Sequence, residues 1–237
     1  MRILKRKFCA ILNLEKVSKG DLMKILSSFM LLSLVLSFGP RTLAINLGDK
    51  MPAVSSSMKG IDGKMYNLAS QKKSKGTLVA FTCNHCPYVK MWEDRLAILS
   101  DEFKDQVGVI HINSNDPEGN PLDNFEGMQK RGAHLAKVVA EHKGQSTKSA
   151  GLSYPYVVDD NSEAARAFGA EKTPEIFLFD AEGILVYKGA VDDSADPKDV
   201  KEQWLRMALS DLVAGRKIAK ASTKAVGCGI RFRSKDS

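Results

Sequence analysis

The sequence predicts an α/β fold, a sandwich in which helices flank a mixed central sheet. Two short apolar runs, at residues 77–82 and 107–113, have the length and the β-branched content of buried strands. Elsewhere apolar residues recur at intervals of three and four, which indicates amphipathic helices. Turn residues at 60–63 and 180–183 separate apolar segments in the way that hairpin turns do. Together these patterns predict the order β-α-β-α-β-β-α, with an extra N-terminal β-hairpin.

The first half of the predicted domain contains the front hairpin, a strand, a helix and a second strand. The hairpin is expected from residues 53–58 and 65–68. A helix is expected from Pro87 onward, because a first helical turn tolerates proline. The apolar face of that helix is predicted to consist of Val89, Trp92, Leu96, Leu99 and Phe103.

The second half begins with a polar, helix-prone but irregular insertion at residues 117–151. The remaining elements are a short strand, a short helix, a second hairpin and a last helix, at residues 156–158, 162–168, 176–179 with 184–188, and 199–215. Asn161 precedes the short helix and has a side chain suited to capping it.

Residues 1–44 are predicted to be a leader, followed by a single domain at 45–237. The apolar run at residues 25–38 is short for a bilayer span, and small residues around Ala44 suit a signal peptidase. We therefore expect a signal peptide at about residues 23–44, cleaved after Ala44, and an exported, periplasmic or otherwise extracytoplasmic protein. Met23 makes a better signal start than Met1, so we interpret the upstream residues as a misassigned start. An uncleaved membrane anchor is the alternative interpretation.

The positive charge of the chain belongs mostly to this leader. The whole chain has a net charge of +7, and residues 1–44 hold eight basic and two acidic residues, which leaves +1 for the mature part. Nothing in that balance argues for binding to nucleic acid or to an anionic membrane surface, so the membrane is expected only as a partner of the uncleaved leader.

Two cysteines in the mature chain, Cys83 and Cys86, lie three residues apart where a strand gives way to a helix. Cysteines at i and i+3 on a first helical turn lie close enough to form a disulfide. The unpaired N–H groups and the positive dipole end of the helix stabilise a thiolate on the first of them. A thiolate attacks disulfides, and a neighbouring thiol then resolves the mixed disulfide. This arrangement is typical of thiol–disulfide oxidoreductases.

The element order, the Cys-x-x-Cys motif and the Thr173–Pro174 dipeptide together resemble the thioredoxin fold. In that family the proline beside the active site is cis and heads an antiparallel strand. It presents backbone groups opposite the cysteines, where an extended substrate can pair. The resemblance therefore implies that Thr173 and Pro174 bind substrate, and Tyr88 is a candidate for lining the same groove, although packing is its simpler role.

The front hairpin makes the chain similar to the exported redoxin branch, which includes AhpC/TSA-like (peroxiredoxin-like) and TlpA-like proteins. More specifically, the chain resembles a group of thioredoxin-like redoxins with four motifs. These appear here as Cys-Asn-His-Cys-Pro-Tyr-Val at 83–89, Tyr-Pro-Tyr at 154–156 with Asp159, Thr-Pro-Glu at 173–175, and Gly-Cys-Gly-Ile-Arg at 227–231. The resemblance covers nearly all of the mature chain.

Two departures from related families bear on the reaction. Peroxiredoxins carry a threonine three residues before the peroxidatic thiol, but here Ala80 and Cys83 stand three residues before the two candidate thiols. Thioredoxin carries Gly-Pro between its cysteines, whereas this chain carries Asn84 and His85. A histidine before the second cysteine is similar to what disulfide isomerases and strong thiol oxidants show.

Three candidate sites admit more than one interpretation. A lone Cys-x-x-Cys is half of a zinc site, but the second pair of ligands is missing, so we predict no metal. His85 is either a stabiliser of the Cys83 thiolate or an exposed spacer. Cys228 is either a buried or free thiol or a third redox thiol near the site, because an odd cysteine in an oxidising compartment needs an explanation.

The other histidines are assigned structural or solvent roles. His111 lies in a predicted strand and is expected to be a satisfied core residue. His134 and His142 lie in the polar insertion and are expected to be solvated.

We therefore predict an exported thiol–disulfide oxidoreductase that acts on protein thiols or disulfides. Cys83 is the nucleophile, Cys86 is the resolving thiol, and His85 lowers the pKa of Cys83. The chain has no flavin or nicotinamide motif, so no cofactor is expected and a second protein must recycle the cysteines. One alternative function is a thiol peroxidase, which the missing threonine weakens. Another is a Cu(I)-binding assembly protein, which normally separates its cysteines by three residues rather than two.

Overall fold

A computed structural model describes residues 44–55 and 57–233 of the chain. The predicted signal peptide, its upstream extension and Cys9 lie outside the described residues, apart from Ala44 at the boundary. Within the described residues, we find no helix with the length and apolar character needed to cross a membrane.

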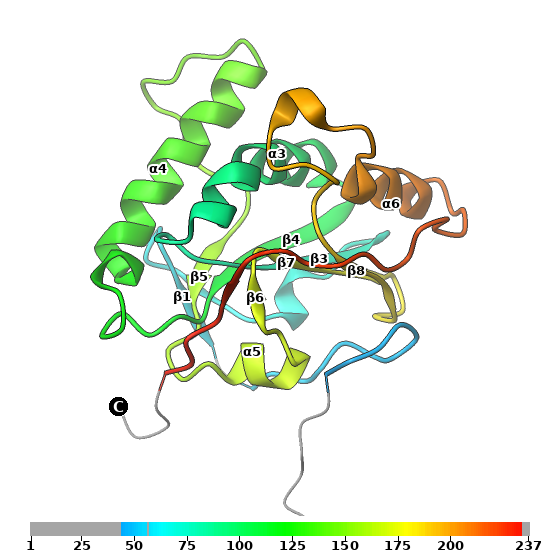
Figure 1. Cartoon of the computed structure of the whole chain (residues 1–237), viewed down its shortest axis with the longest axis horizontal. Helices are drawn as coiled ribbons and strands as arrows, with labels where there is room; N and C mark the ends of the chain where they lie inside the picture. The colour runs from blue at the N-terminus through cyan, green and yellow to red at the C-terminus, as the bar shows by residue number, and fades with distance from the viewer. Residues whose placement is uncertain (1–43, 56, 234–237) are drawn as a thin grey trace, which may run out of the picture. The chain divides into compact units, whose positions relative to one another are not determined.

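A seven-stranded mixed sheet forms the centre of the domain, in the order β2-β1-β5-β4-β3-β7-β8 (Figure 1). Its strands are β1 (Met58–Gly60), β2 (Met65–Tyr66), β3 (Gly76–Thr82), β4 (Val107–Asn113), β5 (Tyr156–Val158), β7 (Glu175–Asp180) and β8 (Leu185–Gly189). β3, β4 and β5 run parallel, whereas β1 and β7 are antiparallel to their neighbours. The fold class and the front hairpin are therefore as predicted.

Helices cover both faces of this sheet (Figure 1). The described residues form four α-helices, α3 (Pro87–Phe103), α4 (Phe125–His142), α5 (Glu163–Phe168) and α6 (Trp204–Val213). α3, α4 and α6 pack on one face, and α5 packs on the other, so that the two largest hydrophobic clusters lie on opposite faces of the sheet. Every residue of β3 and β4 is buried, which agrees with their apolar sequence.

Four predicted details differ from the structure. The front hairpin is shifted and shorter, with strands at Met58–Gly60 and Met65–Tyr66 rather than at residues 53–58 and 65–68. The polar insertion contains α4, a regular helix of 18 residues, because its spaced apolar side chains pack against the sheet and α3. The last helix begins at Trp204 rather than at residue 199, because a 3₁₀ turn (Pro197–Asp199) and an extended segment precede it. At the start of α5, Asn161 accepts a hydrogen bond from Glu163 N, but Asp159 accepts two, from Ala164 N and Ala165 N.

A second, two-stranded sheet was not predicted. It pairs β6 (Lys172–Thr173) with β9 (Cys228–Gly229) in antiparallel register, with Thr173 opposite Cys228. In Figure 1 the C-terminal segment runs beside β6, the short strand that directly precedes β7 in the chain. Through this small sheet, the C-terminal segment lies beside the junction of β3 and α3, where Cys83 and Cys86 are located.

Candidate active site

Cys83 and Cys86 lie at the junction between β3 and α3, as predicted. Cys83 directly follows β3, and Cys86 is the N-terminal capping residue of α3, with Pro87 in the first turn. The parallel β3–β4 pair fixes the strand end, and the missing N–H of Pro87 costs the helix nothing at this position. Cys83 is 1% exposed and Cys86 is fully buried.

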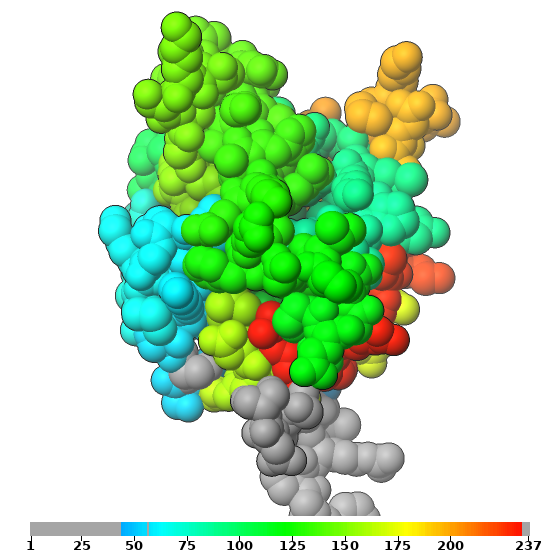
Figure 2. Space-filling view, turned by 90° about the vertical axis from the view of Figure 1, so that its left-hand side faces the viewer, coloured from blue at the N-terminus to red at the C-terminus, as the bar shows by residue number. Residues whose placement is uncertain are grey.

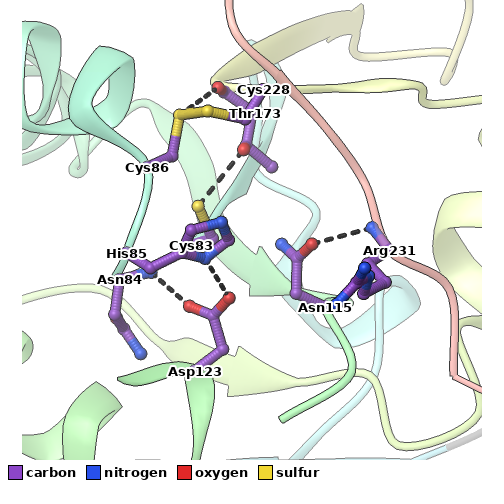
Figure 3. The surroundings of a disulfide bond; sticks show 9 residues. All are labelled: Cys83, Asn84, His85, Cys86, Asn115, Asp123, Thr173, Cys228 and Arg231. Carbon is purple, nitrogen blue, oxygen red and sulfur yellow. Dashed lines mark hydrogen bonds and ion pairs between the residues drawn. A yellow bond between two sulfur atoms is a disulfide. The ribbon is translucent and has the colours of Figure 1, made fainter. Parts of the chain in front are cut away.

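Cys86 forms a disulfide with Cys228 in this structure, with a Cα–Cα distance of 6.1 Å (Figure 3). Cys83 is a free, buried thiol. The predicted Cys83–Cys86 disulfide is therefore not the one present in this form. The register of β6 and β9 explains the difference, because it places Cys228 beside the first turn of α3. Cys228 therefore lies at the site, and its role as a third redox thiol stays a prediction.

Thr173 lies between all three cysteines. Its hydroxyl oxygen is 3.2 Å from Cys83 Sγ, and its carbonyl oxygen is 3.4 Å from Cys86 Sγ. On its other side it pairs with Cys228. The Thr173–Pro174 peptide bond is cis, as the resemblance to thioredoxin implies. Thr173 thus occupies the position opposite the cysteines that was expected of a substrate-binding residue.

The buried carboxylate of Asp123 holds the loop between the two cysteines, a role that was not predicted from the sequence. One carboxylate oxygen accepts a hydrogen bond of 2.7 Å from Asn84 N, and the other pairs with His85 Nδ1 (Figure 3). The Asn84 side chain is held as well, since its amide donates to Leu122 O and its carbonyl accepts from Tyr156 OH at 2.8 Å. These buried bonds fix the shape of the loop.

The pKa of Cys83 is raised to about 11, chiefly because burial disfavours the thiolate. The negative charge of Asp123 raises it further, whereas the Thr173 hydroxyl and the backbone N–H groups of Cys86 and His85 lower it. The predicted lowering of this pKa is therefore wrong for the form with the Cys86–Cys228 disulfide. The expected backbone contribution is present, but desolvation outweighs it.

His85 and Tyr88 lie at the rim of the site. The His85 side chain is a quarter exposed, and its Nδ1 faces the buried carboxylate of Asp123. The His85 side chain therefore contacts the carboxylate whose charge raises the pKa of Cys83, and its role as a stabiliser of the Cys83 thiolate stays a prediction. Tyr88 is 39% exposed and stacks on Trp92, with ring centroids 6.4 Å apart, which fits both packing and a position on a substrate-facing rim.

The remaining histidines have the environments that were predicted. His111 is buried in β4, hydrogen-bonds Ser100 Oγ at 2.9 Å, and has its pKa lowered to about 3 by desolvation. His134 and His142 have side chains that are about half exposed, near Asp94 and Glu102 respectively.

One group of metal-ligand types surrounds the nucleophile. Donor atoms of Cys83, His85 and Asp123 all lie within 4.8 Å of one another. This set of sulfur, nitrogen and oxygen suits a borderline cation such as Zn²⁺ better than Cu(I), which prefers two soft thiolates. Both oxygens of Asp123 already have partners, and the second thiol that a Cu(I) site needs, Cys86, is bonded to Cys228.

The contact between residues 115–123 and the C-terminal segment was not predicted from the sequence. Asn115 Oδ1 accepts a hydrogen bond of 2.9 Å from Arg231 N, and Asp116 N donates to Arg231 O at 2.8 Å. In Figure 2 the C-terminal segment, in red, lies at the surface beside the green segment that precedes α4. The terminal Gly-Cys-x-Ile motif was the one sequence feature that marked the C-terminal segment as important. Its contact with residues 115–123 cannot be derived from local sequence patterns.

Comparisons with known proteins bear on the family and the fold. The model of the AhpC/TSA family matches residues 47–188. An uncharacterized conserved protein from Geobacillus kaustophilus is 32% identical, covers 79% of this chain and 93% of its own, and superposes with a TM-score of 0.65. A hypothetical protein from Sinorhizobium meliloti is 29% identical over 81% of this chain and 97% of its own, with a TM-score of 0.66.

A more distant structure supports the fold alone. A thioredoxin-like protein solved in its oxidized form is 19% identical, covers 73% of this chain and 99% of its own, and has a TM-score of 0.52. No curated protein sequence matches this chain.

Proposed function

Because the chain belongs to the AhpC/TSA family and has a thioredoxin-like fold, we propose that it is an exported thiol–disulfide oxidoreductase acting on protein thiols or disulfides. The observation that carries this proposal is the convergence of three cysteines on one residue. Cys83 Sγ lies 3.2 Å from Thr173 Oγ1, and the Cys86–Cys228 disulfide lies against the same residue. Three sulfurs at one strand end allow a disulfide to move between partners without leaving the site.

The proposed reaction uses Cys83 and Cys86 first and Cys228 afterwards. In the reduced protein, the Cys83 thiolate attacks a substrate disulfide, forming a mixed disulfide and releasing one substrate thiol. The Cys86 thiolate then attacks Cys83 Sγ, which releases the second substrate thiol and leaves a Cys83–Cys86 disulfide. Finally the Cys228 thiolate attacks Cys86 Sγ, which frees Cys83 and gives the disulfide seen here.

Each step conserves electrons, because one disulfide breaks as another forms. The two electrons that reduce the substrate come from two protein thiols, which a recycling partner must reduce again. Run backwards, the same steps oxidise a substrate dithiol. The reduction potential of the cysteines, compared with that of the compartment, decides the direction.

Peroxide reduction is a second candidate, because the Thr173 hydroxyl lies within hydrogen-bond distance of Cys83 Sγ, as the threonine missing at position 80 would. The Cys83 thiolate would attack the O–O bond, giving a sulfenic acid and an alcohol or water, and Cys86 would condense with it, releasing water. The raised pKa of Cys83 argues against this reaction in the form described, since peroxide reacts with the thiolate.

Reduction of insulin disulfides under dithiothreitol tests the main proposal, with hydrogen peroxide consumption and anaerobic Cu(I) titration as parallel assays. We expect disulfide reduction that Cys83→Ser abolishes. Peroxide consumption without disulfide reduction would favour the peroxidase, and stoichiometric Cu(I) binding without either activity would favour the assembly protein.

Export is part of the proposal, and the fold supports a mature protein that begins at Ile45. Ile45 N donates to Phe168 O at 3.3 Å, and the Ile45 side chain packs against the cluster that contains Phe168. Cleavage after Ala44 would therefore leave the first residue anchored. N-terminal sequencing of exported material should begin at Ile45, and recovery of residues 23–44 would favour a membrane anchor instead.

A further inference from the structure

The C-terminal residues 227–233, which we call the docked tail, lie against the edge of the active site as an extended peptide. We propose that this edge is a binding site for extended peptides that contain a Gly-Cys pair, and that the docked tail is its resident occupant, which an outside substrate displaces. This inference rests on the proposed function and names the class of substrate for it.

Backbone hydrogen bonds hold the tail along most of its length. Cys228 and Gly229 pair with Thr173 and Lys172, and Ile230 N donates to Glu171 O at 2.9 Å. Farther along, Arg231 uses its own N–H and carbonyl to bond Asn115 and Asp116. A site that recognises a peptide through its main chain accepts more than one sequence, because every residue except proline offers the same groups.

Side chains of the tail occupy distinct positions in this site. The sulfur of Cys228 is bonded to Cys86. Ile230 is 9% exposed and joins the hydrophobic cluster on the α5 side of the sheet. Arg231 donates from its guanidinium to Gly119 O at 3.0 Å. The site therefore favours an aliphatic residue two positions after the cysteine and a basic residue three positions after it.

The two glycines that flank Cys228 have different surroundings. A Cβ atom added to Gly227 would lie 2.1 Å from the carbonyl oxygen of Thr173, a backbone atom of β6. A Cβ atom added to Gly229 would meet nothing nearer than Glu171 O at 4.0 Å. Neither glycine has a positive φ, so the difference is one of space alone. Any peptide in this register needs glycine before its cysteine but tolerates a side chain after it.

The docked tail also closes the site. With Cys228 packed against them, Cys83 and Cys86 are 1% and 0% exposed, so a protein disulfide has no path to either sulfur. Departure of the tail would uncover both sulfurs and vacate the pairing edge of Thr173 together. A thiol reductant that breaks the Cys86–Cys228 bond by exchange makes this departure possible.

The test uses the full chain carrying Cys228→Ser, reduced beforehand, so that Cys83 and Cys86 are thiols and the tail is held without a covalent bond. The probes are synthetic peptides of residues 225–233, each activated as a mixed disulfide with glutathione. In the register of the docked tail the peptide sulfur faces Cys86. The Cys86 thiolate attacks this sulfur and expels glutathione as its thiolate, and the Cys83 thiolate then attacks Cys86 Sγ, which forms the Cys83–Cys86 disulfide and releases the peptide thiol. The rate of peptide thiol release is measured for the natural peptide and for variants with alanine before or after the cysteine.

We expect the peptide with alanine in place of Gly227 to react roughly 10- to 100-fold more slowly than the natural peptide, the size of a clash with fixed backbone. The peptide with alanine in place of Gly229 should react at the natural rate. Equal rates for both variants would overturn the inference. The reaction with plain glutathione disulfide separates the two claims, because its absence would contradict the proposed function, whereas its presence without peptide discrimination would contradict only the peptide site.

Discussion

Two regions of the molecule bring a cysteine to Thr173, and they are held in different ways. The redox loop, residues 83–87, continues from β3 into α3 and rests on the buried Asp123. The docked tail is held by a strand pair of two residues, a few further backbone bonds and the disulfide itself. Cys86 therefore has a neighbour in the same loop, Cys83, and a disulfide partner in a separately held segment, Cys228. The proposed disulfide relay needs both.

The largest effect is expected from the removal of Cys86, the cysteine of the redox loop that is bonded to the docked tail. Cys86→Ser should reduce insulin reduction to background, because Cys83 can then attack substrates but cannot pass the disulfide on. The variant should accumulate mixed disulfides through Cys83, visible as higher-mass bands without reductant. Cys228→Ser is the matched control and should retain measurable turnover. A Cys86→Ser protein that keeps full activity and traps nothing would contradict the assigned roles.

The contribution of the tail to stability follows from the size of the loop that its disulfide closes. Cys86 and Cys228 are separated by 142 residues, so the chain-entropy model assigns the cross-link about 4–5 kcal/mol. Cys228→Ser should lower the free energy of unfolding of the oxidised protein by up to that amount in a denaturant titration. Under dithiothreitol, the variant and the natural chain should unfold at nearly the same denaturant concentration. A difference that persists under reductant would mean that Cys228 acts through packing instead.

Asp123 holds the redox loop as the disulfide holds the docked tail. Its substitution should cost less stability than the loss of the disulfide. Asp123→Asn should cost about 1–3 kcal/mol of stability, because the buried bonds to Asn84 N and His85 lose a charged partner. It should also lower the pKa of Cys83 from about 11, because the negative charge of Asp123 helps to raise it. Iodoacetamide alkylation of Cys83 as a function of pH measures this shift in the oxidised protein.

The direction of the expected change in the pH profile follows from the protonation state of Cys83 that reacts. Alkylation requires the thiolate, so its rate in the natural chain should rise about tenfold per pH unit below the pKa and level off near pH 11. In Asp123→Asn the curve should move to lower pH. The exposed Asp94 on α3 offers the control substitution Asp94→Asn, which should leave the curve in place. A shift of the Asp123→Asn curve to higher pH would contradict the electrostatic argument.

The sequence predicted the fixed region much better than the removable one. The strands at 77–82 and 107–113 and the helix after Pro87 have strong local patterns, and the structure agrees with them nearly to the residue. The role of Asp123 and the position of Cys228 depend on contacts across 38 and 142 residues. No periodicity or capping rule records such distances. The raised pKa of Cys83 was missed for the same reason, since burial is a property of the assembled domain.

We expect the smallest effect from His85, because its side chain contacts the Asp123 carboxylate, whose charge is a lesser cause of the raised pKa of Cys83. In the Cys228→Ser background, His85→Ala should lower the reduction potential of the Cys83–Cys86 pair by tens of millivolts, where 30 mV is about 1.4 kcal/mol for this two-electron couple. His85→Pro should lower it further and raise the pKa of Cys83 more, because it also removes a backbone N–H that favours the thiolate. Equilibration with glutathione measures both variants. Unchanged potentials would mean that His85 is a spacer.

The central claim, that Cys86 exchanges between Cys83 and Cys228, is tested most directly by mapping disulfides across a series of glutathione potentials. Differential alkylation and peptide mass spectrometry identify the partner of Cys86 at each step. The natural chain should accumulate the Cys86–Cys228 disulfide with Cys83 free, and Cys228→Ser should form the Cys83–Cys86 disulfide over the same range. If Cys228→Ser instead carries only glutathione on Cys86, with Cys83 still reduced, the two cysteines of the redox loop do not exchange and the relay is wrong.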